Sequence, residues 1–248
     1  MEKQTEEFSD ESLRYITTTI GNEPGAAFLK IWQDTKLLEG YRPDHILDVG
    51  TGGGAKLQFL VEKFKSKGVG IEVSPDGVAL LNEHYKHNEN ISFCEGNAYK
   101  LPFATDSFDL VHVWSVFHWV GRNEYLQSIG ESIRVAKRYL MILDFVAHKD
   151  YRTPYHHQPS FFTYKMDFEA LVMNSGIMER IYEKSWRRSH PDNGDSITEI
   201  TLRDLVPFLG NSANYWSVKA VVFEKNYGLL PSLTAKDFNT RNFKPSGK

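Results

Sequence analysis

Residues 48–60 read DVGTGGGAKLQFL, an acid followed by a glycine-rich turn and then by an amphipathic run. Such a turn between a strand and a helix lets backbone N–H groups approach the polar end of a ligand closely. Gly50, Gly52 and Ala55 satisfy G-x-G-x-x-G/A, a pattern typical of dinucleotides bound through their pyrophosphate. With Gly54, the same glycines also satisfy D-x-G-x-G-x-G. The turn therefore predicts a nucleotide-type ligand. The identity of that ligand has to be inferred from the surrounding residues.

The composition of the chain indicates one globular unit. With 248 residues, 41% of them hydrophobic, the chain is long enough to bury one sizeable core and to add a cap. Its 29 basic and 32 acidic residues nearly cancel, so no basic surface for a nucleic-acid backbone is expected. The single cysteine, Cys94, excludes an internal disulfide and fits a reducing compartment. Its apolar surroundings predict a small core residue.

The chain carries no targeting signal that we recognise. Its acidic start, MEKQTEEFSDES, lacks the basic and then apolar order of a signal peptide. No apolar run approaches the ~18 residues that a membrane span requires. We expect a cytoplasmic protein with a small-molecule substrate, without a nucleic-acid partner or a membrane span. The sequence is compatible with a homodimer.

Short apolar runs alternate with helical periodicity from residue 45 onward. In the first helix, Leu57, Leu60, Val61 and Phe64 share one face, and Ser74 and Pro75 begin the next helix as N-cap and first residue. Later helices are expected on Leu126, Ile129, Ile133 and Ala136, and on Phe168, Leu171 and Val172. Alternation of this kind indicates βαβ units and a parallel sheet covered on both faces. The expected strands are 45–50, 68–73, 91–96, 108–114 and 139–145.

The end of the chain has a different pattern. Residues 177–187 and 215–225 are longer and alternate apolar with polar side chains, as edge or antiparallel strands do. A polar loop and a short helix near 201–209 are expected between them. The fold class is therefore α/β and Rossmann-like, mostly parallel, with a C-terminal antiparallel strand. A dinucleotide domain would instead carry six parallel strands or lead into a second domain.

The segments outside the sheet divide the chain into three parts. Residues 8–39 have helical periodicity and are expected to cap the carboxyl edge of the sheet, or alternatively to pack on its flank. We expect an N-terminal helical cap at 1–40, the ligand-binding domain at 41–228 and a poorly ordered tail at 229–248.

Two acids flank the glycine-rich turn. Asp48 would repel a pyrophosphate but suits a ligand that presents an ammonium group, as the methionine half of S-adenosylmethionine does. Glu72 ends the second strand, where a carboxylate accepts both hydroxyls of a ribose. This second acid fits NAD and S-adenosylmethionine equally, so it supports a nucleoside without choosing between them.

The segment EGNAYKLPFATDSFDLVHVWSVFHWV (95–120) decides between the two. It resembles class I S-adenosylmethionine-dependent methyltransferases, which usually read G-D-A-x-x-L-P-F-x-x-x-S-F-D here. The resemblance is closest to the small-molecule group of ubiquinone/menaquinone-biosynthesis and trans-aconitate methyltransferases, and it covers residues 45–146. It implies a seven-stranded methyltransferase sheet and S-adenosylmethionine as cofactor.

The resemblance also implies roles for individual residues. Asn97 stands where the family more often has Asp, and its uncharged oxygen still accepts from the adenine amino group. We expect a modest change in affinity from this difference. The glycines frame the methionine end, Asp48 serves its amino group and Glu72 holds the ribose. The implied cofactor-binding residues are Asp48, Gly50, Gly52, Gly54, Glu72, Val73, Asn97, Ala98 and Trp114.

Chemistry is expected at WSVFHWV, residues 114–120, because the end of the fourth strand faces the transferable methyl group in this fold. His118 would act as a general base on an O–H or N–H nucleophile. Alternatively, it only hydrogen-bonds to the backbone while Trp119 packs on the sheet, because many such enzymes require alignment alone. The sequence leaves both interpretations open.

A second polar and aromatic cluster follows the fifth strand at 148–162 and predicts a substrate loop. Adjacent histidines point apart in an extended chain, so we expect no metal site there. The predicted substrate-binding residues are Trp119, Tyr151, Arg152, Tyr155 and His156.

The sequence predicts S-adenosylmethionine-dependent methyl transfer to a small molecule, at an oxygen, nitrogen or carbon atom. A peptide side chain is an alternative acceptor. A non-catalytic S-adenosylmethionine-binding module and an NAD-dependent oxidoreductase are alternative functions. Aminopropyl transfer is disfavoured, because the run VWSVFHWV lacks the extra acids it requires.

Overall fold

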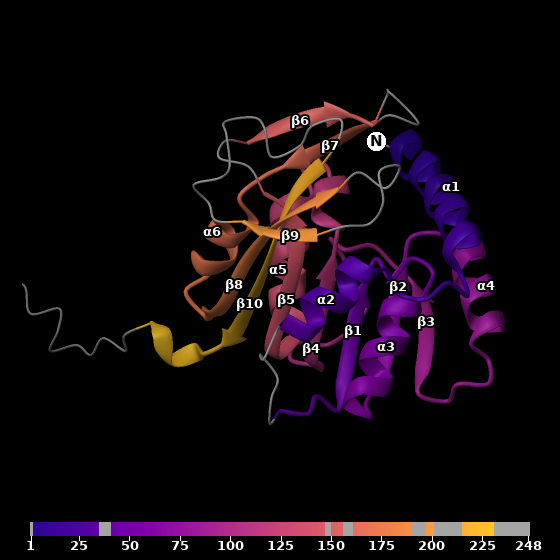
Figure 1. Cartoon of the computed structure of the whole chain (residues 1–248), viewed down its shortest axis with the longest axis horizontal. Helices are drawn as coiled ribbons and strands as arrows, with labels where there is room; N and C mark the ends of the chain where they lie inside the picture. The colour runs from indigo at the N-terminus through magenta and orange to yellow at the C-terminus, as the bar shows by residue number, and fades with distance from the viewer. Residues whose placement is uncertain are drawn as a thin grey trace, which may run out of the picture.

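A computed structural model describes residues 2–34, 41–146, 150–155, 161–189, 197–200 and 215–230. Its centre is one mixed sheet with the strand order β3-β2-β1-β4-β5-β10-β8-β9 (Figure 1). The first five strands in sequence are parallel, as expected from the alternation of strands and helices. They are β1 (His45–Val49), β2 (Lys67–Glu72), β3 (Ile91–Glu95), β4 (Phe108–Trp114) and β5 (Ala136–Phe145).

One of the last strands runs antiparallel to this block, and the strand beyond it runs parallel to the block again. β10 (Tyr215–Lys225) lies between β5 and β8 (Met178–Ser189), which confirms the expected antiparallel pair and the seven-stranded sheet. A short strand that the sequence did not predict, β9 (Ile197–Ile200), adds an eighth member at the edge. The helix expected near 201–209 lies outside the described residues.

Helices cover both faces of the sheet and bury two separate hydrophobic clusters. One cluster contains α2 (Ala26–Asp34), α3 (Ala55–Phe64) and α4 (Pro75–His84), and the other contains α5 (Tyr125–Val135) and α6 (Phe168–Met173). The predicted stripe of α3 is buried, and the Ser74 hydroxyl caps α4 by accepting from the Gly77 amide.

The predicted face of α5 was partly wrong. Leu126 is 65% exposed, because the buried stripe begins one position earlier at Tyr125 and continues through Ser128 and Ile129. Ala136 does not belong to the helix either, since it is the first residue of β5. Cys94 is half-buried against the second cluster, and burial raises the pKa of its thiol.

The N-terminal segment combines both of the arrangements that the sequence left open. α1 (Glu2–Thr19) packs against α4 and lies directly on the glycine-rich turn, where the Tyr15 ring and Thr19 approach Gly52 and Gly53. In contrast, α2 packs on the flank of the sheet through Phe28, Ile31 and Trp32. Only α1 therefore acts as a cap over the carboxyl edge.

The segment expected to be a substrate loop contains a β-hairpin instead. β6 (Tyr151–Pro154) pairs with β7 (Phe162–Lys165) in a separate two-stranded sheet. Figure 1 places this hairpin and the beginning of α1 at the same end of the molecule. Of the expected tail at 229–248, the structure describes only Leu229, which ends a 3-10 helix (Tyr227–Leu229), and Leu230, so the division at residues 40 and 228 stays a prediction. No helix in the described part of the chain is both long and apolar enough to cross a bilayer.

Candidate active site

The glycine-rich turn joins β1 to α3 and requires glycine for two reasons. Gly50, Gly52 and Gly54 have φ angles of 65°, 57° and 84°, a left-handed region that residues with a β-carbon adopt rarely. The turn also has no room for a side chain at Gly50 or Gly52. A β-carbon on Gly50 would lie 2.6 Å from the Val116 side chain, and one on Gly52 would lie 2.8 Å from the Tyr15 ring.

Glu72 reaches the same turn from the end of β2. Its Oε1 accepts a hydrogen bond from the Gly52 amide at 2.6 Å, and its Oε2 accepts one from the Ser12 hydroxyl of α1 at 2.8 Å. The residue is 9% exposed, and this burial raises the pKa of the carboxyl group. A carboxylate with two oxygens facing O–H and N–H donors beside a glycine turn is suited to a pair of ribose hydroxyls.

Asp48 is fully buried and both of its carboxylate oxygens have protein partners. Oδ2 accepts from the Thr51 hydroxyl at 2.8 Å, and Oδ1 lies 2.7 Å from Nδ1 of His112. The sequence did not single out His112. Strand register could have found it, because Asp48 on β1 pairs with His112 on β4. Nε2 of this histidine is buried and has no hydrogen-bond partner among the described residues.

The other predicted cofactor residues lie around the turn in different ways. The Val73 amide donates to Glu72 Oε2 at 3.3 Å, and Asn97 Oδ1 accepts weakly from the Tyr99 amide at 3.5 Å. Ala98 is buried in the second core cluster. The Trp114 ring packs against Phe28 of α2, with ring centres 4.9 Å apart, and its predicted role at the ligand stays a prediction.

His118 forms a buried pair that the sequence did not predict. It lies in a 3-10 helix, η2 (Phe117–Trp119), directly after β4, and it is 7% exposed. Nδ1 lies 2.8 Å from Oδ1 of Asp144, and the His118 amide donates to Oδ2 at 3.1 Å. Asp144, near the end of β5, also accepts from the Phe145 amide at 2.8 Å. The carboxylate therefore fixes the orientation of the imidazole.

The predicted substrate residues separate into an inner and an outer group. Trp119 packs edge-to-face on Tyr155, with ring centres 4.7 Å apart, and Tyr151 faces the buried Lys165. Arg152 instead is exposed, with its guanidinium over the Phe162 ring. The structure does not bring it together with the others, and His156 lies outside the described residues.

Helix α1 closes over this inner group. Phe8 packs against Trp119, with ring centres 5.7 Å apart, and the Tyr155 hydroxyl donates to Glu11 at 2.8 Å. Burial, together with Glu11, raises the pKa of Tyr155 to about 12. The same helix therefore contacts both the glycine-rich turn and the hairpin.

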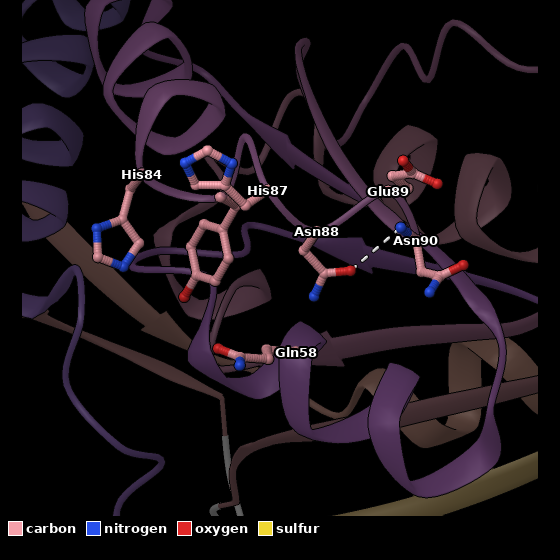
Figure 2. Close-up of a pocket in the computed structure, with 7 residues that line it drawn as sticks. Gln58, His84, His87, Asn88, Glu89 and Asn90 are labelled. Atoms are coloured by element: carbon pink, nitrogen blue, oxygen red, sulfur yellow. Dashed lines mark hydrogen bonds between the residues drawn. The ribbon is translucent and has the colours of Figure 1, made fainter.

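A pocket elsewhere on the molecule contains none of these residues. Figure 2 shows it between α3 and the segment that follows α4, where the side chains that line it are mostly polar and Asn88 accepts from the Asn90 amide. Tyr85, which lines it, reaches the glycine-rich turn, because its hydroxyl donates to the Gly53 carbonyl at 3.0 Å.

Comparisons with known proteins agree with this geometry. Residues 46–138 match a family described as "Methyltransferase domain". A demethylmenaquinone methyltransferase of Chlorobaculum parvum is 40% identical over 103 residues, which are 41% of this chain and 40% of that protein. An erythromycin 3''-O-methyltransferase of Saccharopolyspora erythraea is 31% identical over 37% of this chain and 31% of its own length.

The N-methyltransferase NodS of Bradyrhizobium japonicum, solved with S-adenosyl-L-homocysteine, has the same fold. It is 14% identical, with a TM-score of 0.58 over 88% of this chain and 98% of that chain. The sheet order, the glycine-rich turn with Glu72 and the sequence matches agree with one another: the fold is that of class I S-adenosylmethionine-dependent methyltransferases, and residues 46–138 are similar to methyltransferase domains.

Proposed function

We propose that this protein transfers a methyl group from S-adenosylmethionine to a small-molecule acceptor. The observation that carries the proposal is the contact between Glu72 and the Gly52 amide, because it forms one compact site from the glycine-rich turn and the ribose-type acid. The named relatives act on small molecules such as demethylmenaquinone and erythromycin, and this supports the acceptor class. The acceptor atom, whether oxygen, nitrogen or carbon, is left open.

The residues around the turn fit such a donor. The Ser12 hydroxyl on Glu72 stands where a ribose hydroxyl would bind, so the carboxylate already accepts a donor of that type. Asp48 would act on the ammonium group through its charge, because Thr51 and His112 hold both of its oxygens. Asn97 and the Ala98 amide are proposed at the adenine edge.

The chemistry of transfer falls to His118. When bound, S-adenosylmethionine supplies a methyl group activated by the adjacent sulfonium. Because Asp144 holds Nδ1 of His118, the imidazole offers Nε2 to the acceptor. Nε2 takes the proton that an O–H or N–H nucleophile releases, and Asp144 stabilises the resulting imidazolium. Trp119 and Tyr155 shield the acceptor side from water.

Donor binding and turnover test the proposal separately. Calorimetry should detect binding of S-adenosylmethionine and S-adenosylhomocysteine but not of NAD. Incubation of a cell extract with the protein and a deuteriomethyl donor should yield a labelled small molecule in mass spectra. Donor binding without any labelled product would favour a non-catalytic binding module, and a labelled peptide would favour a peptide acceptor. NAD binding in place of S-adenosylmethionine would overturn the proposal.

A further inference from the structure

Lys165 is a buried cation beside the His118–Asp144 pair, and no part of the mechanism above uses it. It lies at the end of β7 and is 5% exposed. Its ammonium donates to the hydroxyls of Thr153, at 2.8 Å, and Thr163. Among the described residues no carboxylate lies within 4.0 Å of it, whereas the buried Lys225 has one and the buried Lys219 has two. Lys165 is thus solvated by neutral oxygens and not directly neutralised.

The charge of Asp144 acts on Lys165, but this carboxylate already has other hydrogen-bond donors. Asp144 raises the pKa of Lys165, but burial lowers it more strongly, to about 8. Both oxygens of Asp144 accept hydrogen bonds from His118 and from the Phe145 amide. An isolated charge is costly to bury, and proteins normally give such a charge a direct partner. Among the described residues, none of opposite charge pairs directly with this ammonium.

Two contacts place Lys165 next to the proposed base. The Phe145 ring packs edge-to-face on His118, with ring centres 4.6 Å apart, and the same ring lies 5.3 Å from the Lys165 ammonium. The strand that carries Lys165 also packs directly on η2. The Tyr151 ring, 5.9 Å from the ammonium, adds a second aromatic wall. A ligand that met Lys165 would therefore lie on aromatic faces beside the imidazole.

We propose that Lys165 binds a carboxylate of the methyl acceptor, so that the acceptor is a monoanionic small molecule whose nucleophile is held at Nε2 of His118. This inference rests on the proposed function and specifies its substrate class. A carboxylate would accept the ammonium N–H that the two threonines leave over and would supply the absent negative charge. A dianionic phosphate fits less well, because the other cation of β6 and β7, Arg152, is exposed on Phe162.

Matched pairs of acids and amides test this inference without knowledge of the natural acceptor. Benzoate with benzamide, phenylacetate with phenylacetamide, and indole-3-acetate with its amide should be titrated by ligand-observed NMR in the presence of S-adenosylhomocysteine. We expect at least one carboxylate to bind at least tenfold more tightly than its own amide. In Lys165→Met the preference should fall below twofold, whereas in Arg152→Met it should persist.

Two results would overturn the inference: no carboxylate preference in the parent, or a preference that survives in Lys165→Met. The parent measurement decides the first without any variant, and a melting curve of Lys165→Met checks its folding. Calorimetry of S-adenosylhomocysteine on the same samples keeps the two proposals apart. Lost donor binding counts against the proposed function, and a lost carboxylate preference alone counts against the role of Lys165.

Discussion

The proposed donor side and the proposed acceptor side of the candidate site are built over different distances in the sequence. Gly52 and Glu72, which form the donor side, are separated by 20 positions within one strand–helix–strand unit. On the acceptor side, His118 and Asp144 are 26 positions apart, and Tyr155 reaches Glu11 across 144. A local unit fixes its own geometry, whereas contacts between distant segments depend on how the whole chain packs. The donor side can therefore be predicted from a sequence motif, whereas the acceptor side cannot.

The largest expected effect lies on the acceptor side and separates a base from a structural histidine. If His118 is the general base, His118→Ala should lower kcat on the identified acceptor by roughly 10²–10⁴ and leave donor affinity unchanged. The rate should rise with pH in the parent, since the neutral imidazole is the active form, and this limb should vanish in the variant. His87→Ala, at an exposed position, serves as control. A loss confined to KM, with the pH limb retained, would assign His118 to positioning.

The second effect is on stability and tests the burial of Lys165. The pKa of its ammonium falls from its ordinary value of 10.5 to about 8 on folding. Below about pH 8 both states are protonated and the full penalty of burial is present. Between about pH 8 and 10.5 the unfolded chain binds more protons, so the free energy of unfolding should rise with pH, by about 3 kcal/mol.

Urea unfolding of the parent and of Lys165→Met across this window isolates the effect from other titrating groups. The variant should lack the rise, while Lys86→Met, at an exposed lysine, should retain it. The titratable groups beside Lys165 are Asp144 on β5, His118 in η2 and Tyr151 on β6, all present in both proteins. Parallel curves for the parent and Lys165→Met would mean that the folded protein does not desolvate this ammonium.

Asp144 and Lys165 indicate which parts of the site could not be predicted from the sequence. The buried stripe of α3 and the place of Glu72 followed from periodicity and from the length of one βαβ unit. Asp144 was missed although a signal existed, because an acid near the end of the apolar run YLMILDF resembles Asp48 at the end of its own strand. Lys165 had no such signal. Its burial depends on a hairpin, and the neighbouring segment 148–162 was predicted only as a loop.

A third effect tests the donor side alone. Glu72→Ala should weaken binding of S-adenosylmethionine by about 1–3 kcal/mol, because two hydroxyl donors lose a charged acceptor. Glu95→Ala is a close control, since Glu95 ends the neighbouring strand β3 in register with Glu72 but is exposed. Calorimetry should distinguish the two variants, and equal affinities would make Glu72 an ordinary acid at a strand end. Turnover at saturating donor should be nearly unchanged in either variant, which would separate the donor side from the acceptor side.

The smallest effect concerns α1, the element that touches both sides. In the structure the Ser12 hydroxyl donates to Glu72 Oε2, the oxygen that a ribose hydroxyl would need. Donor binding then has to replace this contact, whose net value is about 0.5–1.5 kcal/mol. Ser12→Ala should therefore tighten donor binding a few-fold and lower the melting temperature of the unliganded protein slightly. Thr18→Ala removes an exposed hydroxyl that bonds only to the backbone of α1, and should change neither. Weaker donor binding in Ser12→Ala would mean that Ser12 contacts the donor instead of competing with it, and α1 would then belong to the donor site itself.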